Sequence, residues 1–370
     1  MKAHVYVPTT SPSLNGKRAL MVSMHGCGQT HSDFKTGANW RGTADDYGMV
    51  VALPMASKEG TYGALGCWNF HVGMSASRNQ SDVKYLINMV NALLADTSLN
   101  IDSKQVYITG LSSGGGMVNL MACLAPEMFA GAGVNAGPAP GSGGTDLSNP
   151  GISSSQGRNN CNTLAGSYKS HLYTQLYNNV HGTNDGTVDK AHATRNTEIF
   201  INIYNDQGGS VTACSSSSLS GGGDVTTYCD STGPRISKVL VNGMGHAWPA
   251  GPGSSGGGSY IDHTHINYPD YITAFFFDNN RRVGGAPTPT PTPNPGTPTP
   301  TPTPTPPPSN CQDVTTYNYY HKTNGRATSS GSAWSPSYKA KGSNDSMPGS
   351  TWGTTTLRST NGSYWRVGGC

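Results

Sequence analysis

Short apolar runs alternate with helical patterns over the first 285 residues of the chain. The clearest helical pattern covers residues 81–96, where six apolar side chains share one face of a 3.6-residue period and Ser81 is the expected N-cap. Two further helices are expected directly after Gly114 and over residues 191–205. The apolar runs predict strands at residues 3–8, 18–24, 49–54, 106–109, 131–135, 176–180 and 238–241. This alternation predicts an α/β fold with a mostly parallel sheet, in which active residues gather at the carboxyl ends of the strands.

The pattern breaks at residues 286–309, which contain twelve of the 25 prolines, no charged residue and no large apolar side chain. Proline lacks the N–H that a helix or a central strand needs, so this segment is predicted to be an extended polyproline linker of about 75 Å. It divides the chain into a large domain, residues 1–285, and a small one, residues 310–370.

The small domain has many tyrosines and tryptophans, no phenylalanine and almost no aliphatic residues. Its aromatic side chains either replace an aliphatic core or form an exposed platform that is apolar yet wettable. Cys311 and Cys370 bracket the domain, and a disulfide between them would add roughly 4 kcal/mol to its stability. We therefore expect a small β-rich, disulfide-stapled module that binds the face of a polymer.

The cysteine pattern indicates the setting of the protein. Eight cysteines without a C-x-x-C motif predict disulfides rather than a zinc or redox site. Disulfides in turn predict a secreted, extracellular protein. The six cysteines of the large domain allow many pairings, of which we favour Cys27–Cys67, Cys123–Cys161 and Cys214–Cys229. The chain starts with a strand-like segment, so we expect the mature form of an exported protein.

Charge and hydropathy exclude several partners. No run of 18 apolar residues occurs, so no segment is expected to span a membrane. A net charge of +3 is too small for a nucleic-acid footprint. We expect a monomer that uses neither a metal nor another cofactor.

A strand, a sharp turn and a helix are predicted around Gly110-Leu111-Ser112-Ser113-Gly114. This is the G-x-S-x-G pattern of a nucleophile elbow, in which the flanking glycines let the serine take a strained conformation. Ser112 is therefore predicted to be an exposed nucleophile at the N-terminus of a helix, where the helix dipole favours developing negative charge.

A nucleophilic serine needs a histidine base and an acid that orients the histidine. Asp185 lies in the turn after one predicted strand, and His246 lies on a glycine-rich loop after the last one. Both follow Ser112 in the order expected for this fold, so we assign Asp185 as the acid and His246 as the base. Asp189 is the rival acid, and His181 is expected to be structural.

The oxyanion that forms during ester cleavage needs N–H donors, each contributing roughly 3 kcal/mol. One donor in such a turn is the N–H that follows the nucleophile, here that of Ser113. The predicted strand 18–24 runs directly into His25-Gly26-Cys27-Gly28, so the Cys27 N–H is the expected second donor.

Together these motifs resemble the catalytic domain of extracellular poly(3-hydroxybutyrate) depolymerases, within the α/β-hydrolase superfamily. The resemblance covers most of residues 1–285 and is carried by the serine turn, the Asp185 turn, His25-Gly26-Cys27, Cys67-Trp68-Asn69 and Gly245-His246-Ala247-Trp248-Pro249. The small domain resembles the C-terminal substrate-binding domain of that family, through residues 316–321, 325–327, 341–345, 355–358 and 364–365.

The resemblance implies a serine esterase that hydrolyses solid poly(3-hydroxybutyrate) to oligomers and monomers. It also implies that Trp68, with its neighbour Asn69, lies against the substrate near the oxyanion hole. Trp248, directly behind the catalytic loop, is predicted to face the substrate as well; the alternative for both tryptophans is a place in the core. Residues 138–166 are rich in glycine, serine and asparagine without an apolar period, so we expect no large lid over Ser112.

A feruloyl or acetylxylan esterase with a carbohydrate-binding module is the alternative function, because aromatic platforms and Pro/Thr linkers also suit plant polysaccharides. A non-enzymatic adhesion protein is a third possibility. The presence of Ser112, Asp185 and His246 in the expected order argues against it.

Overall fold

The computed structural model of the chain describes residues 1–283 and 312–368, except 15, 143–146, 207, 333–334, 344, 348–353 and 360–364. The chain divides into two compact units, Met1–Thr290 and Pro291–Cys370. The predicted linker and the disulfide expected between Cys311 and Cys370 lie outside the described residues, so the three-part division stays a prediction.

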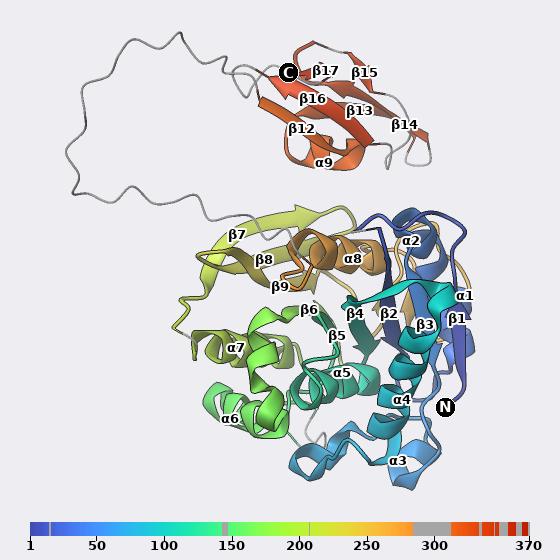
Figure 1. The fold of residues 1–370 in the computed structure, drawn as a ribbon, viewed down its shortest axis with the longest axis vertical. Helices are drawn as coiled ribbons and strands as arrows, with labels where there is room; N and C mark the ends of the chain where they lie inside the picture. Colours follow the sequence, from blue (N-terminus) through green and yellow to red (C-terminus); the bar gives the residue numbers. More distant parts are fainter. Residues whose placement is uncertain are drawn as a thin grey trace, which may run out of the picture. The chain divides into compact units, whose positions relative to one another are not determined.

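A nine-stranded, mostly parallel sheet forms the centre of the larger unit (Figure 1). Its strand order is β1-β3-β2-β4-β5-β6-β9-β8-β7. The six neighbouring strands β3, β2, β4, β5, β6 and β9 pair in parallel. The edge strand β1 pairs antiparallel with β3, and at the other edge β8 pairs antiparallel with both β9 and β7. The strands are β1 Ala3–Tyr6, β2 Arg18–Met24, β3 Val50–Pro54, β4 Ile101–Leu111, β5 Gly131–Asn135, β6 Leu176–Gly182, β7 Thr212–Leu219, β8 Gly223–Asp230 and β9 Gly233–Val241.

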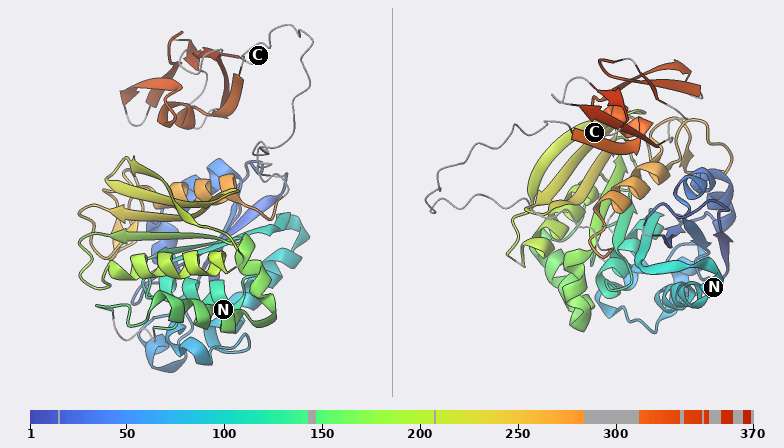
Figure 2. Two further views of the ribbon diagram at one scale, coloured as in Figure 1. Left: turned by 90° about the vertical axis from the view of Figure 1, so that its left-hand side faces the viewer. Right: turned by 45° about the horizontal axis from the view of Figure 1, so that its top comes forward.

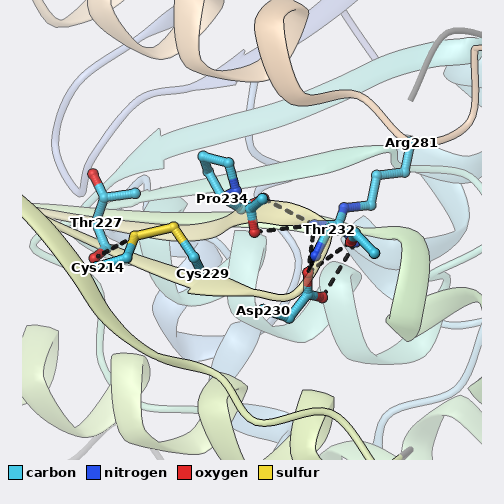
Figure 3. Close-up of a disulfide and its surroundings, with 8 residues drawn as sticks. Cys214, Thr227, Cys229, Asp230, Thr232, Pro234 and Arg281 are labelled. Atoms are coloured by element: carbon cyan, nitrogen blue, oxygen red, sulfur yellow. Dashed lines mark hydrogen bonds and ion pairs between the residues drawn. A yellow bond between two sulfur atoms is a disulfide. The ribbon is translucent and has the colours of Figure 1, made fainter. Parts of the chain in front are cut away.

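All seven predicted strands are present in this sheet, and its two other strands form the hairpin β7–β8 at one edge. The short strands β10 Trp248–Pro249 and β11 Ile261–Asp262, which pair with each other in a separate sheet, were also not predicted. The side chains of β7 are exposed along almost its whole length, so its serine-rich sequence carries no apolar pattern. Figure 3 shows how this edge is fastened: Cys214–Cys229 joins β7 to β8, and Arg281 pairs with Asp230 at 3.0 Å.

Helices cover both faces of the sheet (Figures 1 and 2). One face carries α4 Ser81–Ala95, α5 Ser113–Leu124, α6 Ser154–Ala165 and α7 Ala191–Asn205, and the other carries α1 His31–Gly37, α2 Trp40–Tyr47 and α8 Tyr268–Asn279. The N-cap of α4 is Gln80, so the prediction for Ser81 is wrong by one residue. The Ser81 hydroxyl instead accepts a hydrogen bond from Asn69 Nδ2 at 2.9 Å.

The segment expected to be free of an apolar period contains the helix α6. Small residues let α6 lie close to its neighbours: a Cβ on Gly157 would come within 2.3 Å of Ile199 in α7, and Cys161 is bonded to Cys123 in α5. The helix is therefore part of the layer on the face of the sheet, and no large lid is present over the described part of the larger unit. No described helix has the length and apolar character of a membrane span.

All three disulfides favoured from the sequence of the large domain are confirmed: Cys27–Cys67, Cys123–Cys161 and Cys214–Cys229. The smaller unit contains two three-stranded sheets, β12-β16-β17 and β13-β14-β15. Its elements are β12 Gln312–Tyr317, α9 Asn318–Thr323, β13 Ala327–Ser332, β14 Ser335–Ala340, β15 Ser346–Met347, β16 Thr354–Ser359 and β17 Arg366–Val367.

Aromatic residues of the smaller unit are divided between its core and its surface. Tyr338 and Trp365 are buried beside Leu357, where they replace the missing aliphatic residues. Tyr319 and Tyr320, at the start of α9, are only half-buried, and their rings lie 5.5 Å apart.

Candidate active site

Ser112 occupies the turn between β4 and α5 in a strained backbone conformation, with φ 57° and ψ −117°. Close backbone packing explains both glycines of the motif. A Cβ on Gly110 would lie 2.7 Å from the Gly114 carbonyl carbon, and a Cβ on Gly114 would lie 2.6 Å from the His25 carbonyl oxygen. The Ser112 side chain is partly exposed, and its hydroxyl has no hydrogen-bond partner among the described residues.

His246 and Asp185 form a hydrogen-bonded pair, with His246 Nδ1 2.7 Å from Asp185 Oδ2. The other carboxylate oxygen accepts the backbone N–H groups of Thr187 at 2.8 Å and Val188 at 2.9 Å. Burial alone would raise the pKa of Asp185, but the hydrogen bonds from His181 and His246 hold that pKa well below its usual range. An ionised Asp185 fixes the proton of His246 on Nδ1 and leaves Nε2 as the basic nitrogen.

Two further hydrogen bonds join the loop that carries Asp185 to the loop that carries His246. The Asn184 N–H donates to the Met244 carbonyl at 3.0 Å, and the Gly243 N–H donates to Thr183 Oγ1 at 2.9 Å. The residues that precede the acid and the base are thus hydrogen-bonded to each other, which supports the contact between Asp185 and His246.

Asp189, the rival acid, and His181, which was expected to be structural, lie in the same region. Asp189 Oδ1 accepts the Ala191 N–H at 2.7 Å at the start of α7, and its exposed carboxylate has no contact with His246 in the described structure. His181 is buried; its Nε2 lies 2.8 Å from the Val188 carbonyl and 3.3 Å from Asp185 Oδ2. This position is consistent with the structural role predicted for His181.

The loop that carries the Cys27 N–H, residues 25–29, is called the oxyanion loop below. It is held by His25 and Gln29. His25 Nε2 accepts the Ala56 N–H at 3.2 Å, so Nδ1 carries the proton and donates to the Gly26 carbonyl at 2.8 Å. Burial lowers the pKa of His25 to about 4, which keeps its ring neutral and suited to this pair of contacts. Gln29 Oε1 accepts the Gly26 N–H at 2.8 Å.

The loop lies directly against the serine turn, since a Cβ on Gly26 would approach the Ser112 Cβ to 3.4 Å. The Ser113 N–H stands at the first turn of α5, where helix N–H groups have no partner within the helix. Among the described residues, no hydrogen bond is formed by the N–H of Cys27 or of Ser113. Both groups are therefore available to a substrate oxygen.

The contact role predicted for Trp68 and Asn69 requires a correction, because both side chains are buried and engaged. Trp68 Nε1 donates to the His25 carbonyl at 2.9 Å, and the Trp68 N–H donates to Ser113 Oγ at 3.4 Å. Asn69 Nδ2 donates to the Glu59 carbonyl and to Ser81. Trp68 therefore joins the oxyanion loop to the serine turn from behind instead of facing a polymer.

Trp248 also belongs to the core rather than to a substrate surface. Its side chain is fully buried, its Nε1 donates to the Ala38 carbonyl at 3.1 Å, and its ring packs against Phe34, Trp40 and Tyr268. The core alternative is thus the correct one for both tryptophans.

Two polar residues that the sequence analysis did not single out connect the parts of the site. The Asn135 carbonyl, at the end of β5, accepts the Ser112 N–H at 2.9 Å, and Asn135 Nδ2 donates to the Ala247 carbonyl at 3.1 Å. Asn135 thereby ties the serine turn to the histidine loop. Its place at the carboxyl end of an inner strand could have marked Asn135 as a site residue in the sequence. Gln29, in a loop without periodicity, offered none.

Comparison with known proteins places this geometry in a family. The family model described as "Esterase PHB depolymerase" matches residues 2–217, which include the oxyanion loop, Ser112 and Asp185. The chain belongs to the esterase PHB depolymerase family. His246 lies beyond the matched part of this esterase.

Two curated relatives of the esterase are similar over most of its length. It is 40% identical over 294 residues to a poly(3-hydroxybutyrate) depolymerase of Ralstonia pickettii, covering 77% of this chain and 59% of the relative. It is 28% identical to poly(3-hydroxyalkanoate) depolymerase C of Paucimonas lemoignei, covering 73% of this chain and 65% of the relative. The chain thus spans less than two thirds of the length of either relative.

A solved structure supports the fold. An acetyl xylan esterase from Aspergillus awamori superposes with a TM-score of 0.52 at 18% identity, covering 66% of this chain and 88% of that structure. The α/β-hydrolase fold expected from the sequence is confirmed.

Proposed function

We propose that this protein is a secreted, monomeric serine esterase that hydrolyses solid poly(3-hydroxybutyrate) through an acyl-enzyme on Ser112. The observation that carries the proposal is the His246–Asp185 hydrogen bond of 2.7 Å. Asn135 connects the loop of this histidine to the strained Ser112 by hydrogen bonds to both. The relatives named for depolymerisation of poly(3-hydroxybutyrate) and poly(3-hydroxyalkanoate) suggest the substrate class.

The reaction begins when Ser112 Oγ attacks an ester carbonyl while His246 Nε2 takes the serine proton. Asp185 stabilises the resulting imidazolium through Nδ1. The N–H groups of Cys27 and Ser113 bind the oxyanion of the tetrahedral intermediate. Collapse of the intermediate breaks the bond to the alcohol oxygen, which receives the proton from His246. A water molecule, deprotonated by the same histidine, then attacks the acyl-serine ester. The bond to Ser112 Oγ breaks, Oγ takes the proton back from His246, and the acid is released.

An insoluble substrate agrees with the shape of the site and with the smaller unit. Ser112 is partly exposed, and no large lid covers the described part of the larger unit. A chain at the surface of a solid polymer can reach a serine only in such an open site. The half-buried Tyr319 and Tyr320 of α9 offer an aromatic platform for the polymer. Anchoring through this unit raises the effective concentration of the esterase at the surface. Three disulfides suit an extracellular setting.

The test of this function compares two substrates under identical conditions. Wild-type protein is mixed with a turbid suspension of poly(3-hydroxybutyrate) granules and, separately, with a feruloylated sugar, and both turbidity and free ferulate are measured. We expect the granules to clear and 3-hydroxybutyrate products to appear, with no comparable release of ferulate. Ferulate release without clearing would establish the alternative function, a plant cell-wall esterase.

The role of the smaller unit is tested by ending the chain after Gly285. The shortened protein is expected to hydrolyse a soluble short-chain ester at the rate of the full chain, but to adsorb poorly to granules. Equal clearing by both forms at low concentration would show that the smaller unit is not an anchor.

A further inference from the structure

Tyr260 is an exposed tyrosine in a strained backbone conformation beside His246. Its φ of +62° lies in the left-handed region, which bulky residues rarely adopt. The residue is 52% exposed. The Tyr260 ring centroid lies 5.9 Å from that of His246 with an interplanar angle of 76°, so the two rings meet edge to face.

The flanking contacts hold this strained residue in place. The Trp248 N–H donates to the Tyr260 carbonyl at 2.9 Å. Gln29 Nε2 donates to the Ser259 carbonyl at 2.8 Å, while the same side chain accepts the Gly26 N–H of the oxyanion loop. One glutamine thus fixes both the oxyanion loop and the residue before Tyr260. Strain that the surrounding structure maintains is typical of residues with a function.

The Tyr260 ring offers apolar surface rather than a polar relay. Its hydroxyl makes no hydrogen bond to the described residues, and the residue remains largely open to solvent next to His246. A rigid aromatic ring in such a position suits contact with an apolar ligand.

We propose that Tyr260 contacts the alcohol side of the scissile ester and selects chain-like leaving groups. This proposal rests on the proposed function, in which His246 passes its proton to the departing alkoxide. A ring beside His246 therefore lies next to the departing part of the substrate. The methyl and methylene groups of an aliphatic hydroxyalkanoate chain pack on this ring, whereas a methanol leaving group is too small to use it.

The test measures kcat and KM on two soluble substrates, the linear trimer of 3-hydroxybutyrate and methyl 3-hydroxybutyrate, whose acyl groups are built from the same 3-hydroxybutyryl unit and whose leaving groups differ. Tyr260→Ala is expected to lower kcat/KM for the trimer about tenfold, through KM, since hydrophobic contacts discriminate by roughly 10- to 200-fold. It is expected to change the methyl ester less than about twofold. Tyr260→Phe should retain trimer activity within about twofold, because the contact uses the ring and not the hydroxyl.

Tyr260→Gly separates function from folding. Glycine accepts the positive φ without strain, so this variant should melt at the same temperature as wild type or higher while losing trimer activity as Tyr260→Ala does. The matched control is Tyr168→Ala: Tyr168 is 41% exposed, but its ring lies under Arg78, whose guanidinium binds the Leu124 carbonyl at the far end of α5. Tyr168→Ala should leave kcat/KM unchanged for both substrates.

Three outcomes would overturn the inference while leaving the proposed function intact. They are an unchanged kcat/KM for the trimer, an equal fall on both substrates, and a shifted pH profile on the methyl ester, which would make Tyr260 a positioning residue for His246. If wild-type protein cleaves neither ester nor the polymer, the proposed function fails and the inference fails with it.

Discussion

His246 Nδ1 lies 2.7 Å from Asp185 Oδ2, and the remaining Asp185 oxygen is occupied by two backbone N–H groups. The carboxylate thus has one oxygen for its own loop and one for the ring nitrogens of His246 and, at 3.3 Å, His181. Asp185→Asn would present an amide N–H or a weaker acceptor to Nδ1 and favour the wrong tautomer of His246. We expect kcat on a soluble ester to fall about 10³- to 10⁴-fold.

Asp189→Asn is the matched control for Asp185→Asn. It removes the same charge four positions away, at the start of α7, and should change kcat by less than about threefold. If the two variants lose activity equally, the assignment of Asp185 as the orienting acid is wrong.

Asn135 joins the serine turn to the histidine loop, so its side chain should matter for the rate as well as for stability. Asn135→Ala leaves the partly buried Ala247 carbonyl without its donor, and we expect kcat to fall about tenfold with KM little changed. Asn179→Ala is the control, because Asn179 is equally buried on the adjacent strand but donates to Thr197 of α7. Both variants should lose thermal stability. A similar loss of kcat in both would contradict the positioning role.

The sequence predicted the parallel sheet and its three main helices because buried strands and amphipathic helices carry strong apolar patterns. It also placed Ser112, Asp185 and His246 at the strand ends that the fold uses. Trp68 and Trp248 were harder: a tryptophan next to a catalytic loop has the same sequence signal whether it faces a ligand or packs behind the loop. Tyr260 lies in a glycine- and serine-rich stretch, and only the fold reveals its ring beside His246.

The Cys27–Cys67 disulfide is expected to support catalysis as well as stability, because it fastens the oxyanion loop. Replacing both cysteines by alanine should lower the free energy of unfolding by roughly 4 kcal/mol in the chain-entropy model and also reduce kcat. The Cys214–Cys229 disulfide, in the edge hairpin of Figure 3, joins cysteines that are 15 residues apart in the sequence, against 40 residues for Cys27–Cys67. Removing that pair should cost roughly 3 kcal/mol but leave kcat unchanged. Equal kcat for the two double variants would refute the link to the oxyanion loop.

Asp270, in the first turn of α8, is expected to make stability depend on pH. Burial, and then the nearby charge of Asp46, raise the pKa of Asp270 to about 7. The unfolded chain releases this proton near its ordinary value of 3.8, so the folded state binds more protons between these two values. The contribution of this group to stability therefore falls as the pH rises from about 4 through 7.

Asp270→Asn removes that penalty. Relative to wild type, its melting temperature should be higher at pH 8 and nearly equal at pH 4, as measured by thermal unfolding at both values. A variant that is less stable than wild type at pH 8 would show that the Asp270 charge is favourable in the fold.

The most direct test of the central claim is to titrate the protein with a fluorophosphonate, which labels activated serines covalently. The labelled residue is located by peptide mass spectrometry, and clearing of poly(3-hydroxybutyrate) granules is measured at each degree of labelling. We predict one label, on Ser112, and a loss of clearing in proportion to it. Full clearing by protein that is completely labelled at Ser112, or loss of clearing in protein whose label lies on another residue while Ser112 stays unlabelled, would contradict the account.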